Sequence, residues 1–435
     1  MLEGPALGFA GFLVVLALIM LRVPVAITMG IVGALGYGMA NGFATLGLIL
    51  GKSLFDTFSP VNLSVIPLFI LMGVFAGHGG VSYSLYNLMA SFVGHFRGGL
   101  AMATVGASAL FGAVSGSSVA TTATIGKIAM PEMRRLGYDD RLASASVAAG
   151  GTLAVMIPPS ILFVIYGLMT ENSIGQLFIA GLLPGILGAV LYMCAIWWMT
   201  WRQPRLGPPS ARVAWGARVR ALREVWQVVL LFGVVLGGMY GGLFAPTEAA
   251  AVGAFGALFL AAVTGRLTLR ALREGFTETA STSAMIFMIL VGAGIFNYFI
   301  DTTGFTNSLI GAVEEASLNR WMVFLLLCVF YILLGCVMDS LSMILLTIGA
   351  VYPLVTALGF DPIWFGVMLV TLGEIGLITP PIGINLFILA GTVSNLSLLT
   401  VCRGIAPFVA ADCVRMAALT LFPAIALWLP SYMKL

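Results

Sequence analysis

The stretch "IPPSILFVIYGLMT" (residues 157–170) places two consecutive prolines inside a long apolar run. A proline pair removes two amide donors and clashes with the preceding helical turn, so it interrupts a helix. The same arrangement returns in "TPPIGINLFI" (residues 379–388), with the proline pair 222 residues further along the chain. Two interrupted helices at this spacing therefore indicate that the chain consists of two related halves.

The composition places the chain in a membrane. Its 435 residues are 60% hydrophobic and only 9% charged, with a mean hydropathy of +1.08, far from the values of soluble domains. Apolar runs recur from end to end, and no stretch alternates in the roughly ten-residue rhythm of a lipid-facing barrel strand. The sequence therefore predicts an all-α integral membrane protein.

The reactive and charged residues exclude several classes of protein. The five cysteines and two histidines have no spacing typical of a metal site or of a disulfide framework. The net charge of +3 is small, and the basic residues lie mostly in short loops, which argues against nucleic-acid binding. We therefore expect neither a metal-dependent hydrolase nor a nucleic-acid-binding protein.

The 222-residue spacing extends beyond the proline pairs. It also aligns Pro24 with Pro246 and Pro131 with Pro353, although the chain has only 19 prolines. The motif "LGYD" at residues 136–139 falls on "LGFD" at residues 358–361. We predict two structural repeats, residues 1–222 and 223–435.

Basic residues mark the cytoplasmic ends of membrane segments. On this basis the predicted crossings of the first half are 5–21, 24–41, 61–77, 142–170 and 177–201, with amphipathic connectors at 44–57 and 82–96. Residues 98–131 are predicted to form a cytoplasmic re-entrant hairpin, because the second leg, ending at Pro131, is shorter than the roughly 20 residues that a crossing needs. Arg22 follows the first crossing, so the N-terminus is expected to be periplasmic. Five crossings are an odd number, so the second half is expected to run inverted.

The inverted second half has the corresponding parts. Residues 321–353 are predicted to form a periplasmic hairpin ending at Pro353, and residues 363–394 a broken helix like 142–170. The loop after the first hairpin carries three arginines, whereas the loop after the second carries none. An inverted repeat with a hairpin and a broken helix in each half is typical of secondary transporters, whose site lies at the midplane.

The tip of the first hairpin, "SGSS", offers oxygen ligands. The hydroxyls of Ser115, Ser117 and Ser118 face backbone carbonyls near the break, at Ala154, Ile157 and Pro158, which the prolines deprive of helical donors. Such oxygens suit a hard cation such as sodium, and the helix N-termini beside them favour a substrate carboxylate. The alternatives are a close-packed crossing of small residues for "SGSS" and a kinked scaffold helix for each proline pair.

The second tip, "MDSLS", contains an acid. Asp339 falls on Ser117 of the first tip, and acids at membrane depth are costly and usually functional. We predict a second cation site from Asp339, Ser340, Ser342, Thr379 and the freed carbonyl of Gly376. For Glu374 two interpretations stay open: it lines the cavity or carries a proton, or it is a carboxyl paired within the scaffold.

Four longer motifs resemble the large membrane subunit (DctM-like) of the tripartite ATP-independent periplasmic (TRAP) transporters. They are "GAVSGSSVATTATIGKIAMPEMRRLGYD", "GGTLAVMIPPSILFVIYGLMT", "FAPTEAAAVGA" and "GEIGLITPPIGINLFI". The resemblance implies a sodium-coupled importer of an organic acid such as a C4-dicarboxylate or sialic acid, working by an elevator mechanism in the bacterial inner membrane, and not an enzyme. It also implies two partners, a small four-helix membrane subunit and a periplasmic substrate-binding protein.

The resemblance also assigns roles to matching positions. It implies one sodium site at Ser115 and Ser117 with the backbone before Pro159, and a second at Asp339 with the backbone from Gly376 to Thr379. The residues implied to face the substrate are Ser117, Thr121, Ser160, Asp339 and Asn385.

Two other functions compete with this one. The nearer is a single-component dicarboxylate carrier that works without a binding protein. The other is an intramembrane enzyme with Asp339 and Glu374 as paired acids, although neither lies in a Gly-x-Gly-Asp setting.

Overall fold

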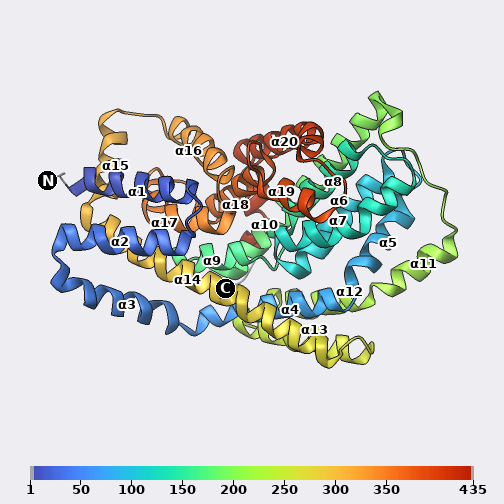
Figure 1. Ribbon diagram of the computed structural model, residues 1–435, viewed down its shortest axis with the longest axis horizontal. Coiled ribbons are helices and arrows are strands. Elements are labelled where there is room, and N and C mark those ends of the chain that lie inside the picture. The colour runs from blue at the N-terminus through green and yellow to red at the C-terminus, as the bar shows by residue number, and fades with distance from the viewer. Residues whose placement is uncertain (1–3, 433–435) are drawn as a thin grey trace.

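The computed structural model describes residues 4–432, which form α-helices and short 3-10 turns with no strand among them (Figure 1). The helices of the first half are α1 (Gly4–Met20), α2 (Val25–Asn41), α3 (Leu46–Phe58), α4 (Val65–His78), α5 (Val81–Val93), α6 (Gly99–Ser115), α7 (Ser118–Arg135), α8 (Asp140–Thr152), α9 (Ile161–Thr170) and α10 (Ile174–Arg202). Those that follow are α11 (Trp215–Glu224), α12 (Trp226–Tyr240), α13 (Pro246–Val263), α14 (Leu269–Thr303), α15 (Phe305–Glu315), α16 (Arg320–Gly335), α17 (Ser340–Ala357), α18 (Pro362–Ile378), α19 (Ile384–Thr392), α20 (Leu398–Leu421) and α21 (Ala424–Leu427).

Helix bounds in the two halves follow the 222-residue spacing. Shifting α7 by this spacing reproduces α17 at both ends, since residues 118–135 become 340–357. Shifting α9 gives 383–392, against 384–392 for α19, and shifting α2 gives 247–263, against 246–263 for α13. The bounds of these helices thus follow the same 222-residue spacing as the prolines.

Both predicted interruptions are present. The first lies between α8 and α9, where a 3-10 turn at Leu153–Val155 leads into the Pro158–Pro159 pair. The second lies between α18 and α19, around Pro380–Pro381. Each proline pair therefore separates two helical segments within one apolar stretch, as the sequence indicates.

The second legs of the two hairpins are longer than predicted. The sequence predicts that these legs end at Pro131 and Pro353. Both prolines instead lie inside their helices, which continue to Arg135 and Ala357. A single proline removes one helical hydrogen bond, and tertiary packing offsets this loss. In α7 this packing comes from Ala129, Met130 and Met133, which are fully buried.

The halves differ where one proline is missing. In the first half α3 and α4 meet at a 61° bend, and Pro60 lies between them. The equivalent position in the second half is Thr282, which lies inside the unbroken 35-residue helix α14. In Figure 1, α14 runs from the end of the molecule that holds α1 and α2 to α13.

The helices differ in their ability to cross a bilayer. By length and composition, five helices within residues 4–432 are long and apolar enough, namely α10, α13, α14, α17 and α20, or six spans if the bent α3–α4 pair counts as one. Seven shorter apolar helices of 10–17 residues accompany them. The molecule is therefore a multi-pass membrane protein, and α17, predicted as a hairpin leg, is long enough to count among the five.

The longest packing contact depends on a glycine. α14 lies along α2, and a Cβ atom added to Gly33 would lie 2.7 Å from the backbone nitrogen and Cα of Phe296. Real Cβ atoms do not approach backbone this closely, so the position requires a residue without a side chain. Gly237 in α12 is a contrasting site, because a Cβ there meets nothing within 4 Å.

Gly33→Leu should separate α2 from α14 and lower the free energy of unfolding by about 1–3 kcal/mol, the usual effect of overpacking. The measurement is the melting temperature of the purified protein in detergent. Gly237→Leu is the matched control and should leave it unchanged or raise it, since leucine favours a helix by up to about 1 kcal/mol over glycine. Equal melting temperatures for Gly33→Leu and the wild type would contradict the packing described here.

Candidate functional site

The first tip is a compact cluster of hydroxyl groups. Gly116 turns the chain in the left-handed region, with φ of 60°, and Ser117 caps α7 by accepting the Ala120 amide at 3.3 Å. The hydroxyls of Ser115 and Thr121 are 2.7 Å apart, and the Ser117 amide donates to Ser115 Oγ at 3.4 Å. Three of the predicted site residues are thus within one hydrogen-bonded cluster.

The tip lies against the first broken helix. A Cβ atom on Gly116 would lie 3.4 Å from the carbonyl oxygen of Pro159. At the break, the Ile157 amide donates to Leu153 at 3.2 Å, and the Ser160 hydroxyl donates to the Val155 carbonyl. Since Pro158 has no amide hydrogen, the carbonyl of Ala154 lacks its usual helical donor.

Ser160 is therefore already engaged inside the protein. Its side chain is fully buried, donates to the Val155 carbonyl and accepts the Phe163 amide at 3.4 Å, so it caps α9. These contacts explain its place in the break without a ligand.

Asn385, in the second half of the chain, forms hydrogen bonds with the first tip and with α8. Its side-chain amide donates to Ser118 Oγ at 2.7 Å and to the Ala148 carbonyl at 3.2 Å. Asn385 is fully buried, and within residues 4–432 its Oδ1 atom accepts no hydrogen bond. The start of α19 is thus fastened to α7 and α8, and one buried acceptor faces the same region.

The second tip is organised by Asp339, which caps α17. Its carboxylate accepts the Ser342 amide at 3.1 Å and the Ser342 hydroxyl at 2.6 Å. Ser340 is buried beside Gly373, where an added Cβ would lie 2.7 Å from Ser340 Oγ. In the described part of the chain Ser340 Oγ has no hydrogen-bond partner, so it is a second unused oxygen.

One prediction for the second break is wrong. The Gly376 carbonyl is not free, because it accepts the Thr379 amide at 3.2 Å. Pro380 has no amide hydrogen to donate to the Gly376 carbonyl. The last turn of α18 is therefore tighter, and the Thr379 amide donates to this carbonyl instead. The Thr379 hydroxyl donates to the Ile375 carbonyl at 2.6 Å. A Cβ on Gly376 would lie 2.5 Å from Gly335 Cα, so the end of α16 adjoins this break.

The two tips are not directly bonded to each other. No hydrogen bond or ion pair among residues 4–432 joins the Ser115–Thr121 cluster to Asp339 or Ser342. The short helix after each break instead packs against the hairpin of the other half. Thus α19 packs on α7 and α8, and α9 packs on α17 and α18. Each half therefore completes the hairpin region of the other.

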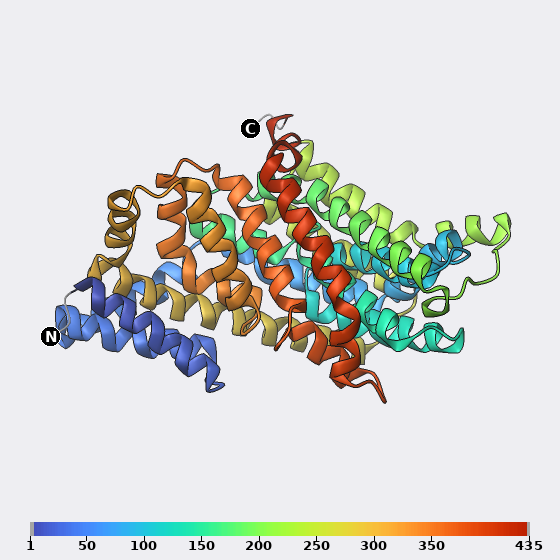
Figure 2. The ribbon, with the colours of Figure 1, turned by 90° about the horizontal axis from the view of Figure 1, so that it is seen from above.

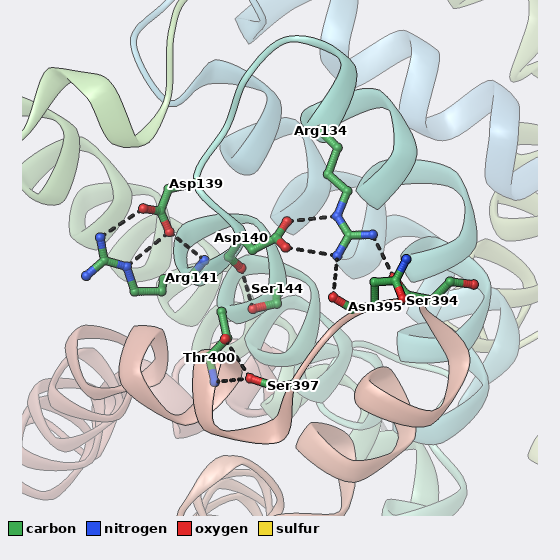
Figure 3. Close-up of polar contacts among 9 residues, drawn as sticks. All are labelled: Arg134, Asp139, Asp140, Arg141, Ser144, Ser394, Asn395, Ser397 and Thr400. Atoms are coloured by element: carbon green, nitrogen blue, oxygen red, sulfur yellow. Dashed lines mark hydrogen bonds and ion pairs between the residues drawn. The ribbon is translucent and has the colours of Figure 1, made fainter.

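The ends of the hairpins away from the tips also form contacts between the two halves. Arg134, at the end of α7, is bidentate with Asp140 at 2.8 and 2.9 Å and donates to the Ser394 carbonyl, beyond α19, at 2.8 Å (Figure 3). In the other half, the Asn172 side chain, beyond α9, donates to the hydroxyl of Tyr352 in α17 at 3.1 Å. Each hairpin is thus tied to the loop that follows the partner half's broken helix.

The loop between α7 and α8 holds a second ion pair. Arg141 and Asp139 are 2.8 Å apart, and Figure 3 shows them beside the Arg134 pair. The hydrogen bond from the Arg141 guanidinium lowers the pKa of the Asp139 carboxyl. Asp139 also caps α8 by accepting the Arg141 amide, so the start of the first broken helix is well fixed.

Glu374 is a paired, enclosed carboxyl rather than a group lining an open cavity. It is fully buried and forms an ion pair with Arg415 of α20, which also pairs with Asp412 at 2.8 Å. Sequence reasoning missed Arg415 and Asp412. The available signal was an acid and a base three residues apart inside an otherwise apolar helix.

The fold and the polar groups enclosed within it define a multi-pass membrane transport protein. Residues 12–425 match the family described as "Tripartite ATP-independent periplasmic transporter, DctM component", and the chain belongs to this family.

Individual proteins give the same result. The chain is 37% identical over 385 residues to the C4-dicarboxylate TRAP transporter large permease protein DctM of Pseudomonas aeruginosa, covering 88% of this chain and 90% of that one. It is 30% identical over 416 residues to the sialic acid TRAP transporter large permease protein SiaM of Vibrio cholerae, covering 92% and 97%. These relatives are permease subunits and not enzymes, so the intramembrane-enzyme alternative is not supported.

The fold also resembles a solved transporter. The YdaH transporter of Alcanivorax borkumensis superposes with a TM-score of 0.65 at 15% identity, covering 90% of each chain. At this identity the likeness concerns the fold alone.

Arg134→Met should free the loop after α19 from the first hairpin. Because the Arg134 side chain is 31% exposed, we expect a modest loss of about 1 kcal/mol in stability. The more specific effect is faster hydrogen exchange of amides in residues 384–397. Arg135→Met is the matched control, since among the described residues Arg135 pairs with Glu132 of its own helix alone. Equal exchange in the two variants would contradict the cross-half role of Arg134.

Proposed function

We propose that this chain is the large permease subunit of a TRAP system that imports an organic acid, driven by sodium ions. The observation that carries the proposal is the convergence of each hairpin tip with a broken helix. Gly116 adjoins Pro159 in the first half, and Gly335 adjoins Gly376 in the second. Irregular backbone at membrane depth is tolerated where protein surrounds it or where it lines a polar cavity, and both conditions suit a transport site.

The first tip supports a sodium site by its donor chemistry. The hydroxyls of Ser115, Ser117 and Ser118 and the carbonyls of Ala154, Ile157 and Pro158 are neutral oxygens of the kind that hard cations prefer. Thr121 holds the tip through its bond to Ser115. A bound sodium ion would supply a positive charge beside the N-terminus of α7, where a substrate carboxylate is also favoured.

The second tip supports a further sodium site with a formal negative charge. Asp339 and Ser342 already share hydrogen bonds, and Ser340 Oγ has no partner among the described residues. The Gly376 carbonyl keeps one lone pair beyond its bond to the Thr379 amide. A cation here would therefore have carboxylate, hydroxyl and carbonyl oxygens from the tip and the break.

We propose that the substrate carboxylate binds between the tips. Ser117 and Asp339 occupy equivalent positions at the starts of α7 and α17, and Asn385 adds a buried oxygen that accepts no hydrogen bond within residues 4–432. Ser160 and Thr121 shape the site through the contacts described above. The relatives named for C4-dicarboxylate and sialic acid make a carboxylic acid the substrate class we favour.

Coupling follows from charge balance. A bound carboxylate or a bound sodium ion alone would expose unpaired charge on crossing, whereas both together are closer to neutral. Each sodium ion in excess of the substrate charge adds about 2.3 kcal/mol per 100 mV of membrane potential. In an elevator mechanism, the hairpins and broken helices would move as one body against the other helices. The contacts that tie α19 to α7 and α9 to α17 support such a body.

The proposed partners are those of a tripartite system in the bacterial inner membrane: a small four-helix membrane subunit and a periplasmic binding protein. The family and its permease relatives favour this assembly over a single-component carrier. Proteoliposomes holding this chain and the small subunit should take up a labelled carboxylic acid only with the binding protein and an inward sodium gradient. Uptake by this chain alone would contradict the tripartite assignment.

In the same vesicles, Asp339→Asn should raise the sodium concentration needed for half-maximal uptake by about tenfold, equivalent to about 1.4 kcal/mol. Asparagine caps a helix as well as aspartate does, so α17 should stay folded. Asp361→Asn is the matched control, because Asp361 caps α18 in the same way, accepting the Trp364 amide at 2.9 Å. Unchanged sodium dependence in Asp339→Asn would remove Asp339 from the proposed site.

A further inference from the structure

One face of α7, the second leg of the first hairpin, is not covered by the rest of the protein. Exposed and half-buried residues recur on α7 every three or four positions, which on a helix makes one continuous face. This open face of α7 consists of Ala120, Thr124, Lys127, Ile128, Pro131 and Arg135. It begins one turn after Ser117 of the tip, which is itself half-buried, and runs to the end of the helix.

The corresponding leg of the second half is covered. Thr124 corresponds under the 222-residue spacing to Leu346 of α17, which is buried. Lys127 corresponds to Gly349, where an added Cβ would lie 2.7 Å from Asn297 Oδ1 of α14. Figure 1 and Figure 2 show the gold helix α14 running beside the orange leg α17. A lysine at position 349 would therefore have no room.

The helices that precede the hairpins account for this difference. In the second half α14 packs on α17, the second leg of its hairpin. In the first half the equivalent segment is α3 with α4, and α4 packs on α6, the first leg. The two halves thus cover different legs of their hairpins, which leaves one face of α7 open.

The open face of α7 differs from the apolar surfaces that suit lipid. The exposed side chains of α16 include Leu325, Val329 and Leu333. The open face of α7 instead presents Thr124 and the charged Lys127 in the middle of the helix. A charge placed in hydrocarbon is costly, and charged residues within membrane segments usually face a water-filled cavity. We therefore expect water rather than lipid beside this face.

Lys127 is the uncompensated positive charge on the open face. It is the only basic residue of the sequence between Arg97 and Arg134. Its side chain is exposed, and within residues 4–432 it forms no hydrogen bond or ion pair. Arg135, at the end of the same face, is paired with Glu132. An anion moving along the open face would therefore meet its unpaired cation at Lys127.

We propose that the substrate carboxylate leaves the site along the open face of α7, toward the cytoplasm, and that Lys127 attracts it there. This inference rests on the proposed function, in which the carboxylate binds at Ser117. Ten residues of helix separate Lys127 from Ser117, or about 15 Å, so the lysine lies beyond the site on the way to the arginine-bearing end of α7. A flexible ammonium is a point charge that attracts a carboxylate without the two-pronged grip of an arginine, which suits release.

The direct test measures water access and local charge at Thr124, one turn from Lys127. Thr124→Cys is introduced into a variant without the five native cysteines and expressed together with the small membrane subunit. Inside-out membrane vesicles are then labelled with an anionic and a cationic thiol reagent of similar size. Relative to a free thiol in solution, Thr124→Cys should favour the anionic reagent by about fivefold, because a unit charge one turn away acts within the Debye length.

Two charge variants assign this preference. Adding Lys127→Gln to Thr124→Cys should abolish it. Arg135→Gln is the matched control and should keep it, because Arg135 is about 16 Å from Thr124 along the helix, beyond the Debye length of about 8–10 Å. The same preference with and without Lys127 would overturn the role of Lys127.

A third variant tests whether the face is open. Leu346→Cys, the equivalent position on the covered leg, should stay unlabelled in the same vesicles. Failure of both reagents to label Thr124→Cys, or equal labelling of Thr124→Cys and Leu346→Cys, would overturn the open face. Labelling requires no transport, so this failure is distinct from a failure of the proposed function.

Uptake into proteoliposomes gives the functional readout. Lys127→Gln should slow uptake of a labelled carboxylic acid by about tenfold at low salt, the lower end of electrostatic steering effects. The sodium concentration for half-maximal uptake should not change, because Lys127 lies outside the proposed cation sites. Lys127→Arg keeps the charge and should restore most of the rate. Uptake at the wild-type rate in Lys127→Gln would overturn the proposal.

Discussion

Backbone groups that lose their helical partners inside a bilayer must find partners within the protein, and the rest of the structure depends on this constraint. The two proline pairs, one in each half, create such groups. A hairpin end packs closely against each break, at Gly116 in the first half and at Gly335 in the second. Short helices that follow the breaks then pack on the opposite half, where Asn385 bonds to Ser118. The breaks, the tips and the cross-half contacts are thus one arrangement.

The two halves share this arrangement but differ in chemistry, and the differences are single residues. Pro60 lies between α3 and α4, whereas Thr282 lies inside α14, so the first half has a bend where the second has one continuous helix. Ser117 at the first tip corresponds to Asp339 at the second, which adds a formal charge to one proposed cation site only. We propose that the two halves are repeats of one plan and that these substitutions distinguish them.

The helix breaks and turns around the candidate site could be predicted from the sequence, because prolines and small polar residues have strong local effects. The interruptions lie where the proline pairs predict them, and the tips contain the predicted serines. Predictions from local sequence were wrong where packing or a tighter turn replaces a lost hydrogen bond. α7 continues past Pro131 because its neighbours bury that turn, and the Gly376 carbonyl accepts a hydrogen bond from the Thr379 amide. The pairing of Arg415 with Glu374 could not be predicted, because it joins residues on two different helices, although the Asp412–Arg415 spacing within α20 was visible in the sequence.

We propose that the two halves are inserted in the membrane in opposite orientations. Arg135 and Ala357 test it most directly, because they are exposed, equivalent positions at the ends of α7 and α17. Each is replaced by cysteine in a variant without the five native cysteines and labelled in intact cells with a thiol reagent that cannot cross the membrane. We expect Ala357→Cys to be labelled in intact cells and Arg135→Cys to be labelled only after the membrane is opened. Labelling of both positions from the same side would contradict it.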